Sequence, residues 1–229
     1  MRYCVSDLHG KYDLFLKLLD KIKFSDSDVL YVCGDIIDKG EDSIKLLKLL
    51  LSMPNARCIA GNHEYAFIKY CRSIKKKTAE SRGGLLKVLQ DYFVSPDGKL
   101  LDEAAVRGIK CLPFYIEEQN FICVHAGLPL GGDARIVPPE LVEREFIAGD
   151  RRFKDPDVLP KDSKCVFFGH TPTRNVCGRD EILAYIRPHS SGRDIADYIK
   201  VHLDTRAWFS GVMGCFCIDT CRAEYVRLN

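Results

Sequence analysis

The sequence has little tryptophan or methionine, no long apolar run and almost no net charge. It contains one Trp and three Met among 229 residues, and its formal net charge is +2. No apolar stretch approaches the roughly 20 residues that a membrane-spanning helix needs. The balance of charge gives no broad basic face for nucleic acid or lipid headgroups. We therefore expect neither nucleic acid nor a membrane among the partners.

The cysteine pattern of a secreted disulfide scaffold or a zinc ribbon is also missing. The eleven cysteines are odd in number, and no two are spaced as C-x-x-C. Five lie inside predicted strands, where cysteine behaves as a small buried apolar residue: Cys4, Cys33, Cys58, Cys123 and Cys165. We expect no signal peptide, because the first polar motif begins at Ser6. These features predict a reducing, cytoplasmic environment.

What the sequence does contain is a pattern repeated five times, in which a short apolar run stops at a residue able to bind metal. Short runs with β-branched and aromatic residues, bounded by glycine, are typical of buried strands. In layered α/β proteins ligands collect where such strands end, so the pattern predicts one site built from five loops. Its carboxylate, imidazole and amide groups are those of a metal centre. The polar motifs are residues 6–10, 34–40, 61–64, 125–127 and 169–171.

Helical periodicity separates the first strands. Apolar residues recur at helical spacing over residues 14–22, 44–51 and 64–74. The resulting strand–helix alternation predicts parallel strands with right-handed crossovers. A mixed α/β architecture with helices outside is the economical solution, in a single domain over residues 1–229.

The second half of the chain has a different pattern. Residues 85–93 predict a helix and residues 95–98 a turn. Residues 129–163 and 172–200 are predicted to be surface excursions between strands. Strands are predicted at 201–205, 214–218 and 223–228.

Each candidate ligand also has a structural explanation when taken alone. Asp7 and His9 point to one face of an extended segment, which suits one metal ion, but Asp7 also fits a helix cap. Asp35 has two carboxylate oxygens that can bridge two ions, and it too could be a cap or turn residue. Asn62, at a strand-to-helix junction, is both a good N-cap and a possible ligand.

The two later histidines, His125 and His170, each end an apolar run, where a lone histidine is more often a core or turn residue. The joint pattern favours a metal site, because five separate structural explanations would have to place a ligand type at the same end of a strand. His189 and His202 lack this setting and are predicted to be structural or surface residues.

In order and spacing these motifs resemble the calcineurin-like metallophosphoesterases, and most closely their phosphoprotein phosphatase branch of small bacterial and phage serine/threonine phosphatases. The family signature is G-D-x-H-G, G-D-x-x-D-R-G and G-N-H-E followed by two separate histidines. It matches residues 6–10, 34–40 and 61–64, then His125 and His170. The resemblance implies a layered α/β fold in which central mixed β-sheets form a β-sandwich flanked by helices.

Three positions depart from the family pattern. Ser6 replaces the leading glycine of the first motif. Lys39 stands where the family usually has arginine, which keeps the charge but gives up bidentate phosphate binding. Arg206 replaces the glycine of a D-T-G-A stretch and would bring a bulky cation near the expected site, where it could alter substrate choice.

The resemblance implies a role for each site residue. One divalent ion would be held by Asp7, His9 and Asp35, and a second by Asp35, Asn62, His125 and His170. Mn²⁺ is the expected ion in assays, with Fe or Zn as alternatives. A metal-bridging hydroxide would attack phosphorus in line.

The remaining implied roles concern the proton and the phosphate. His63 would act as the general acid, oriented by Asp38. Phosphate would be bound by Lys39, Asn62 and either Arg151 or Arg152.

Four functions compete. The first is a metal-dependent phosphomonoesterase, a protein serine/threonine phosphatase acting on a phosphorylated protein or small phosphoester. The alternative is a dinucleoside-polyphosphate hydrolase of the diadenosine tetraphosphate type. That branch usually lacks the aspartate matching Asp38 and has G-N-H-D, so Asp38 and Glu64 favour the phosphatase. A nuclease would usually carry G-H-x-H, where this chain has Pro172. The intact ligand set and the His63–Asp38 pair argue against the fourth function, that of a non-catalytic metal-binding relative.

Overall fold

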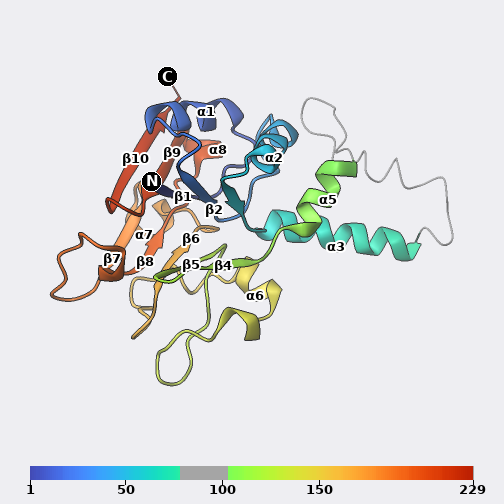
Figure 1. Cartoon of the computed structure of the whole chain (residues 1–229). Helices are drawn as coiled ribbons and strands as arrows, with labels where there is room; N and C mark the ends of the chain where they lie inside the picture. The colour runs from blue at the N-terminus through green and yellow to red at the C-terminus, as the bar shows by residue number, and fades with distance from the viewer. Residues whose placement is uncertain (78–102, 229) are drawn as a thin grey trace.

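Apolar strands and amphipathic helices fold into two five-stranded sheets stacked on each other (Figure 1). The computed structural model describes residues 1–77 and 103–228. The helix predicted at 85–93 and the turn at 95–98 lie outside these residues. The two mixed sheets and their flanking helices confirm the predicted α/β fold.

The first sheet has the order β10-β9-β1-β2-β3 and contains the three predicted parallel strands. Helices α1 (Tyr12–Lys21) and α2 (Ser43–Ser52) make the two crossovers, and β9 pairs antiparallel with β1. The strands are β1 (Arg2–Val5), β2 (Val29–Val32), β3 (Ala56–Cys58), β9 (Val212–Cys217) and β10 (Arg222–Arg227).

The second sheet has the order β4-β5-β6-β8-β7, with β5, β6 and β8 parallel and the two edge strands antiparallel. Here one prediction is wrong: residues 172–200 are not a continuous surface excursion. They contain β7 and the start of β8. The apolar alternation of β7 is weak, so this edge strand depends on its pairing with β8. The strands are β4 (Tyr115–Glu117), β5 (Phe121–Val124), β6 (Cys165–Phe168), β7 (Leu183–Ile186) and β8 (Tyr198–His202).

The remaining helices lie at the ends and outer sides of the sheets (Figure 1). The third predicted helix begins at Asn62, two residues before the expected start. The segment 129–163 is mostly irregular but includes two short helices. The helical elements are α3 (Asn62–Lys77), α5 (Glu103–Cys111), η1 (Pro139–Leu141), α6 (Arg144–Gly149), α7 (Arg174–Cys177), η2 (Ile195–Asp197) and α8 (Ala207–Ser210).

Side-chain alternation along the central strands divides the core into two layers. In β1, Cys4 belongs to the smaller cluster between the sheets, while Tyr3 and Val5 belong to the larger cluster with α1 and α2. In β6, Phe167 lies in the smaller cluster and Phe168 in the larger one. Both faces of these strands are therefore buried, which explains their nearly continuous apolar sequences.

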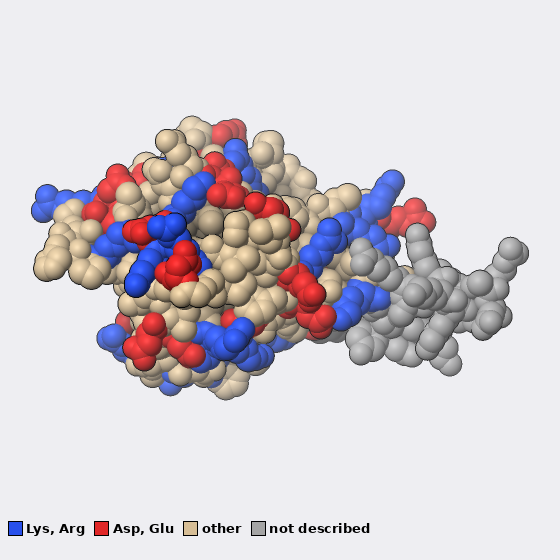
Figure 2. All heavy atoms as spheres, turned by 90° about the horizontal axis from the view of Figure 1, so that it is seen from below, with Lys and Arg blue, Asp and Glu red and all other residues tan. Residues whose placement is uncertain are grey.

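Within the described residues the cysteines form no disulfide bond. Cys4, Cys33 and Cys123 meet in the smaller core, with Cys4 Sγ lying 3.4 Å from Cys33 Sγ and 3.9 Å from Cys123 Sγ. On the face in Figure 2, basic and acidic side chains are interspersed rather than gathered into one large field of a single sign. Within residues 1–77 and 103–228, no helix has the length and apolar character needed to cross a membrane.

Candidate metal centre

The ends of β1, β2, β5 and β6 and the start of α3 bring the predicted ligands together. Several of these residues have left-handed backbone conformations, with φ of 55° at Asp7, 41° at His9, 54° at Asp35 and 70° at His170. Such a conformation is uncommon for residues other than glycine and costs on the order of 1–3 kcal/mol where it is strained. The loops are held in place by backbone hydrogen bonds such as that from Asp7 N to Gly34 O, at 3.1 Å.

Asp35 occupies the centre of the cluster. Its Oδ2 lies 3.5 Å from His9 Nε2, and its Oδ1 lies 3.3 Å from His125 Nε2. Two groups of potential ligands contain it, one with His9 and His63 and the other with His125 and His170, each with ligand atoms within 4.8 Å of one another. A carboxylate shared by two groups in this way is suited to bridging two ions.

Asn62 and two histidines converge on one point. Asn62 Oδ1 lies 2.9 Å from His125 Nε2 and 2.8 Å from His170 Nδ1. Because His125 Nδ1 donates to the Cys33 carbonyl at 2.8 Å, its Nε2 faces the Asn62 oxygen either with a second proton or with a shared cation. His170 Nε2 is buried without a hydrogen-bond partner in the described residues. This donor set fits a divalent cation.

His9 gives a second sign that a cation fits here. Its Nδ1 donates to the Ile37 carbonyl at 3.1 Å, which leaves the Nε2 lone pair free to bind a cation. In this structure the Lys39 ammonium donates to that lone pair at 2.9 Å. A positive charge therefore already sits beside His9 and Asp35.

Asp7 is fixed from two directions. Ser6 Oγ donates to Asp7 Oδ2 at 2.5 Å, and the backbone N–H of His170 donates to the same oxygen at 3.0 Å. The serine that replaces the family's glycine thus orients the carboxylate. Gly169 is required next to it, because a Cβ there would lie 2.0 Å from Asp7 Oδ2.

Burial and close charges shift the protonation of these groups. Burial raises the pKa of Asp7 to about 6, and it lowers the pKa of His9 to about 4 and that of His170 to about 3. Burial also disfavours protonated His125, but the Asp35 carboxylate outweighs that effect and raises the pKa of His125 to about 10. In the metal-free protein, then, a proton on His125 balances Asp35, and a divalent ion would replace it.

Glu64 organises the site without facing it, a role that the sequence did not reveal. Its buried carboxylate accepts four backbone N–H groups, from Asp35, Ile36, Ile37 and Gly61, at 2.8 to 3.0 Å. These bonds join the end of β2 to the start of α3. The only sequence signal was the glutamate at the end of the G-N-H-E motif.

The predicted acid and its partner are in contact. His63 Nδ1 lies 2.6 Å from Asp38 Oδ2, and His63 Nε2 lies 3.7 Å from Asp35 Oδ2. Burial lowers the pKa of His63, but the hydrogen bond to Asp38 and the negative charges of Asp35 and Asp38 together outweigh burial, and the net shift is upward. The same bond lowers the pKa of Asp38 to about 2. These interactions favour the protonated form of His63 at the edge of the ligand cluster.

The two candidate phosphate-binding arginines differ in their surroundings. Arg152 Nε pairs with Asp150 Oδ1 at 3.1 Å, and its guanidinium stacks on Phe146. The charge of Arg151 instead acts on His170 and contributes to lowering the pKa of that ligand, after burial and His125. This contrast favours Arg151 as the arginine that faces the site.

A buried lysine anchors the loop that follows Arg151. Lys200 Nζ donates to the carbonyls of Phe153, Asp155 and Val158 at 2.7 to 2.8 Å. The side chain is fully buried, and burial lowers its pKa to about 8. Sequence reasoning missed this anchor, because a lysine inside a strand gives no indication of distant backbone partners.

The structure also shows the positions of Arg206, His189 and His202, which the sequence analysis distinguished from the candidate ligands. Arg206 has φ of 57°, and its guanidinium lies 4.4 Å from the Phe209 ring centroid and 3.5 Å from Asp180 Oδ1. His189 is exposed. His202 is buried, stacks on Phe168 and contacts the Thr171 carbonyl, and it belongs to neither ligand group.

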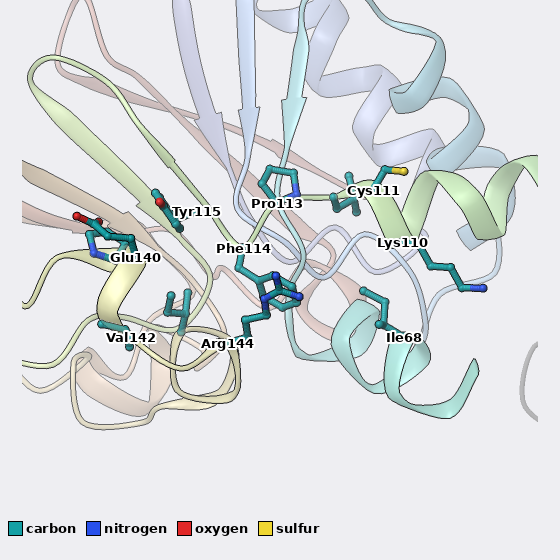
Figure 3. A pocket seen from close by; sticks show the side chains of 12 residues that line it. Ile68, Lys110, Cys111, Pro113, Phe114, Tyr115, Glu140, Val142 and Arg144 are labelled. Atoms are coloured by element: carbon teal, nitrogen blue, oxygen red, sulfur yellow. The ribbon is translucent and has the colours of Figure 1, made fainter. Parts of the chain in front are cut away.

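A separate cavity of about 450 Å³ lies between α3, the end of α5 and the η1–α6 segment (Figure 3). Figure 3 shows the Arg144 guanidinium against the Phe114 ring, 5.2 Å from its centroid. Two backbone hydrogen bonds link its walls to the ligand loops, from Ala60 N to Pro113 O and from Ala126 N to Ile147 O, each 2.8 Å. The predicted ligands do not line it.

The class of protein follows from a match that spans most of the chain: it is a metallophosphoesterase. Residues 3–211 match the calcineurin-like phosphoesterase family, and the chain belongs to that family. The resemblance seen in the motifs is confirmed.

Curated relatives include symmetrical bis(5'-nucleosyl)-tetraphosphatases. That of Aggregatibacter actinomycetemcomitans is 34% identical over 130 residues, covering 55% of this chain and 44% of the relative. That of Haemophilus influenzae strain PittEE is 32% identical over 149 residues, covering 63% and 50%. The matched segments thus span about half the length of these relatives.

Solved structures share the fold. A crystal structure of a candidate diadenosine tetraphosphatase has a TM-score of 0.67 at 18% identity, covering 99% of this chain and 92% of that one. A cold-active protein-tyrosine phosphatase of Shewanella has a TM-score of 0.56 at 13% identity, covering 99% and 80%. At these identities the similarity concerns the fold alone.

Proposed function

We propose that this chain hydrolyses dinucleoside polyphosphates with the help of two divalent metal ions. The observation that carries the proposal is the position of Asp35, which joins two groups of ligands around one carboxylate. The tetraphosphatase relatives support the substrate class. This choice reverses the order of preference that Asp38 and Glu64 suggested in the sequence.

Each ligand has a place in this proposal. Asp7, His9 and Asp35 would hold one ion, and a second would be held by Asp35, Asn62, His125 and His170. When bound, the two ions would stabilise charge on the phosphate oxygens and lower the pKa of water. Their charge exceeds that of the two carboxylates, so the site attracts a polyanion. Mn²⁺ is the expected ion in assays, and Fe or Zn also suits oxygen and nitrogen ligands.

The other residues act on the proton and the phosphate. His63, oriented by Asp38, would protonate the leaving oxygen, a contribution of roughly 10²–10⁴-fold for general acids. Lys39 and Arg151 would contact the phosphate chain, with Asn62 beside them. Lysine at position 39 gives a point charge that adapts to a flexible polyphosphate, whereas arginine would form a fixed two-pronged contact.

One observation favours a second candidate, phosphomonoester hydrolysis of the protein serine/threonine phosphatase type. The 2.6 Å contact between His63 and Asp38 supports the proposed role of His63 as a general acid. An alkoxide leaving group needs such an acid more than a nucleoside phosphate does, because the alkoxide is far more basic. A phosphorylated protein therefore stays in the test as a substrate.

A direct comparison of rates tests the proposal. The full chain would be assayed with Mn²⁺ on diadenosine tetraphosphate and on a phosphoserine peptide, with Asp35→Asn as the background. We expect the larger kcat/KM on the dinucleotide. A larger value on the peptide would overturn the proposal in favour of the second candidate. Turnover no higher than that of Asp35→Asn on either substrate would instead indicate a non-catalytic relative.

A further inference from the structure

Two aromatic residues of α8 extend outward from the metal centre. The Trp208 ring lies 6.4 Å from the ring of His9, and the Phe209 ring lies 5.6 Å from Trp208 at an interplanar angle of 70°. Trp208 is half-buried, whereas Phe209 is 67% exposed. The two rings therefore form a corner whose inner wall borders the site and whose outer wall faces solvent.

A cation fixes the inner wall. Lys39 Nζ lies 4.9 Å from the Trp208 ring centroid and also 2.9 Å from His9 Nε2. The ammonium that would meet the phosphate chain thus contacts Trp208 at the same time. A phosphate held by Lys39 would lie beside this aromatic corner.

A second cation fixes the outer wall. The Arg206 guanidinium lies 4.4 Å from the Phe209 ring centroid, and its Nε forms an ion pair with Asp180 Oδ1 at 3.5 Å. Asp204 Oδ1 accepts the backbone N–H of Arg206 at 2.7 Å, which secures its left-handed conformation. The bulky residue that replaces the family's glycine therefore backs the Phe209 ring rather than filling the site. The solvent-exposed part of the ring is a flat apolar surface of fixed orientation.

We propose that the Phe209 ring, with Trp208 as side wall, is the surface on which a nucleobase of the substrate stacks. This inference rests on the proposed function, because it assigns the nucleoside end of a ligand whose phosphates occupy the metal centre. In a nucleotide, a flat aromatic base lies a short distance from negatively charged phosphates. This arrangement matches the aromatic corner and the cations beside it. Stacking on an aromatic ring does not depend on which polar groups line the edge of the base, so the site would accept different bases.

The kinetic test removes the exposed ring. Phe209→Ser is expected to lower kcat/KM on diadenosine tetraphosphate about tenfold, mainly through KM, since stacking energies of this kind correspond to such factors. On p-nitrophenyl phosphate, which has no nucleobase, its kcat/KM should stay within about twofold. Phe209→Tyr should retain wild-type values. Leu141→Ser is the matched control, because Leu141 is a similarly exposed apolar residue, 74% exposed, on η1.

A binding test does not depend on turnover. Trp208 is the only tryptophan, so its fluorescence reports on the corner directly. Adenosine, which has no phosphate, should quench this fluorescence in the wild-type chain and quench it much less in Phe209→Ser. Equal quenching in both proteins, or equal losses on both kinetic substrates, would overturn the stacking role.

The two proposals fail in different ways. Turnover of the dinucleotide by the wild-type chain with an unchanged kcat/KM in Phe209→Ser overturns the stacking role and leaves the proposed function in place. Absence of dinucleotide turnover by the wild-type chain overturns the proposed function. In that event the adenosine titration alone decides whether the corner binds a base.

Discussion

The carboxylate of Glu64 accepts the backbone N–H of Asp35 at 2.9 Å, and the Glu64 side chain is fully buried. Glu64 also accepts the N–H groups of the two residues that follow Asp35, Ile36 and Ile37, and that of Gly61. A single side chain thereby sets the turn that places the proposed bridging ligand. An aspartate at this position would have to reach the same donors with one methylene fewer.

We expect Glu64→Gln to destabilise the protein by about 2–5 kcal/mol, because an amide nitrogen would face buried N–H donors. Metal affinity should fall about 10- to 100-fold, as it does when residues that orient ligands are lost. Chemical denaturation and calorimetric titration with Mn²⁺ measure the two effects. Glu145→Gln is the control, since Glu145 is 71% exposed and pairs only loosely with Lys69. Wild-type affinity in Glu64→Gln would contradict the orienting role.

Gly169 should tolerate no side chain. A Cβ there would lie 2.0 Å from Asp7 Oδ2 and 2.1 Å from Ser6 Oγ, so Gly169→Ala displaces the Asp7 carboxylate. Activity and metal affinity are expected to drop at least about tenfold. At Gly149 an added Cβ meets nothing within 4 Å, so Gly149→Ala is the matched control. Equal activities of the two variants would show that Asp7 does not depend on this contact.

The pH dependence of hydrolysis should report on His63. Burial lowers its pKa, and the hydrogen bond to Asp38, together with the charges of Asp35 and Asp38, raises it by more. Asp38→Asn removes the raising contribution, so the alkaline limb of the kcat/KM profile should move to lower pH. The shift should be larger with phenyl phosphate than with p-nitrophenyl phosphate, because the poorer leaving group needs the proton more. An alkaline limb at the same pH in Asp38→Asn would count against His63 as the acid.

The titration of Lys200 should make the free energy of unfolding depend on pH. Burial lowers its pKa to about 8 in the folded chain, against an ordinary value of 10.5. Between these pH values the unfolded chain binds the additional proton, so the free energy of unfolding should rise with pH over that interval. The variant Lys200→Met lacks this titration, and the difference between the two unfolding curves isolates it. Lys161→Met, which removes an exposed lysine, is the control. Parallel curves for the wild type and Lys200→Met would refute the assignment.

The sequence was sufficient to predict that the candidate ligands lie close together. Asp7, Asp35, His125 and His170 each follow a short apolar run, and strand ends in a layered fold lie close together for topological reasons. The three parallel strands of the first sheet were also predictable, because amphipathic helices of sufficient length separate them.

Other features depended on contacts distant in the chain. Glu64 and Lys200 act through backbone groups of other segments, which no local pattern identifies. The strand β7 became visible only through its pairing with β8. The orientation of Arg206 depends on Asp180 and Phe209, so its effect on the site could not be read from the D-T-R-A stretch alone.

We propose that Asp35 joins two metal sites, and the number of metal ions bound per chain is the most direct measure of this bridging role. The metal-free chain and Asp35→Asn would each be dialysed against Mn²⁺, and bound metal per chain would be measured by inductively coupled plasma mass spectrometry. We expect two ions per wild-type chain and a loss of affinity at both sites in Asp35→Asn. One ion per wild-type chain, or two ions bound equally well by Asp35→Asn, would contradict the bridging role.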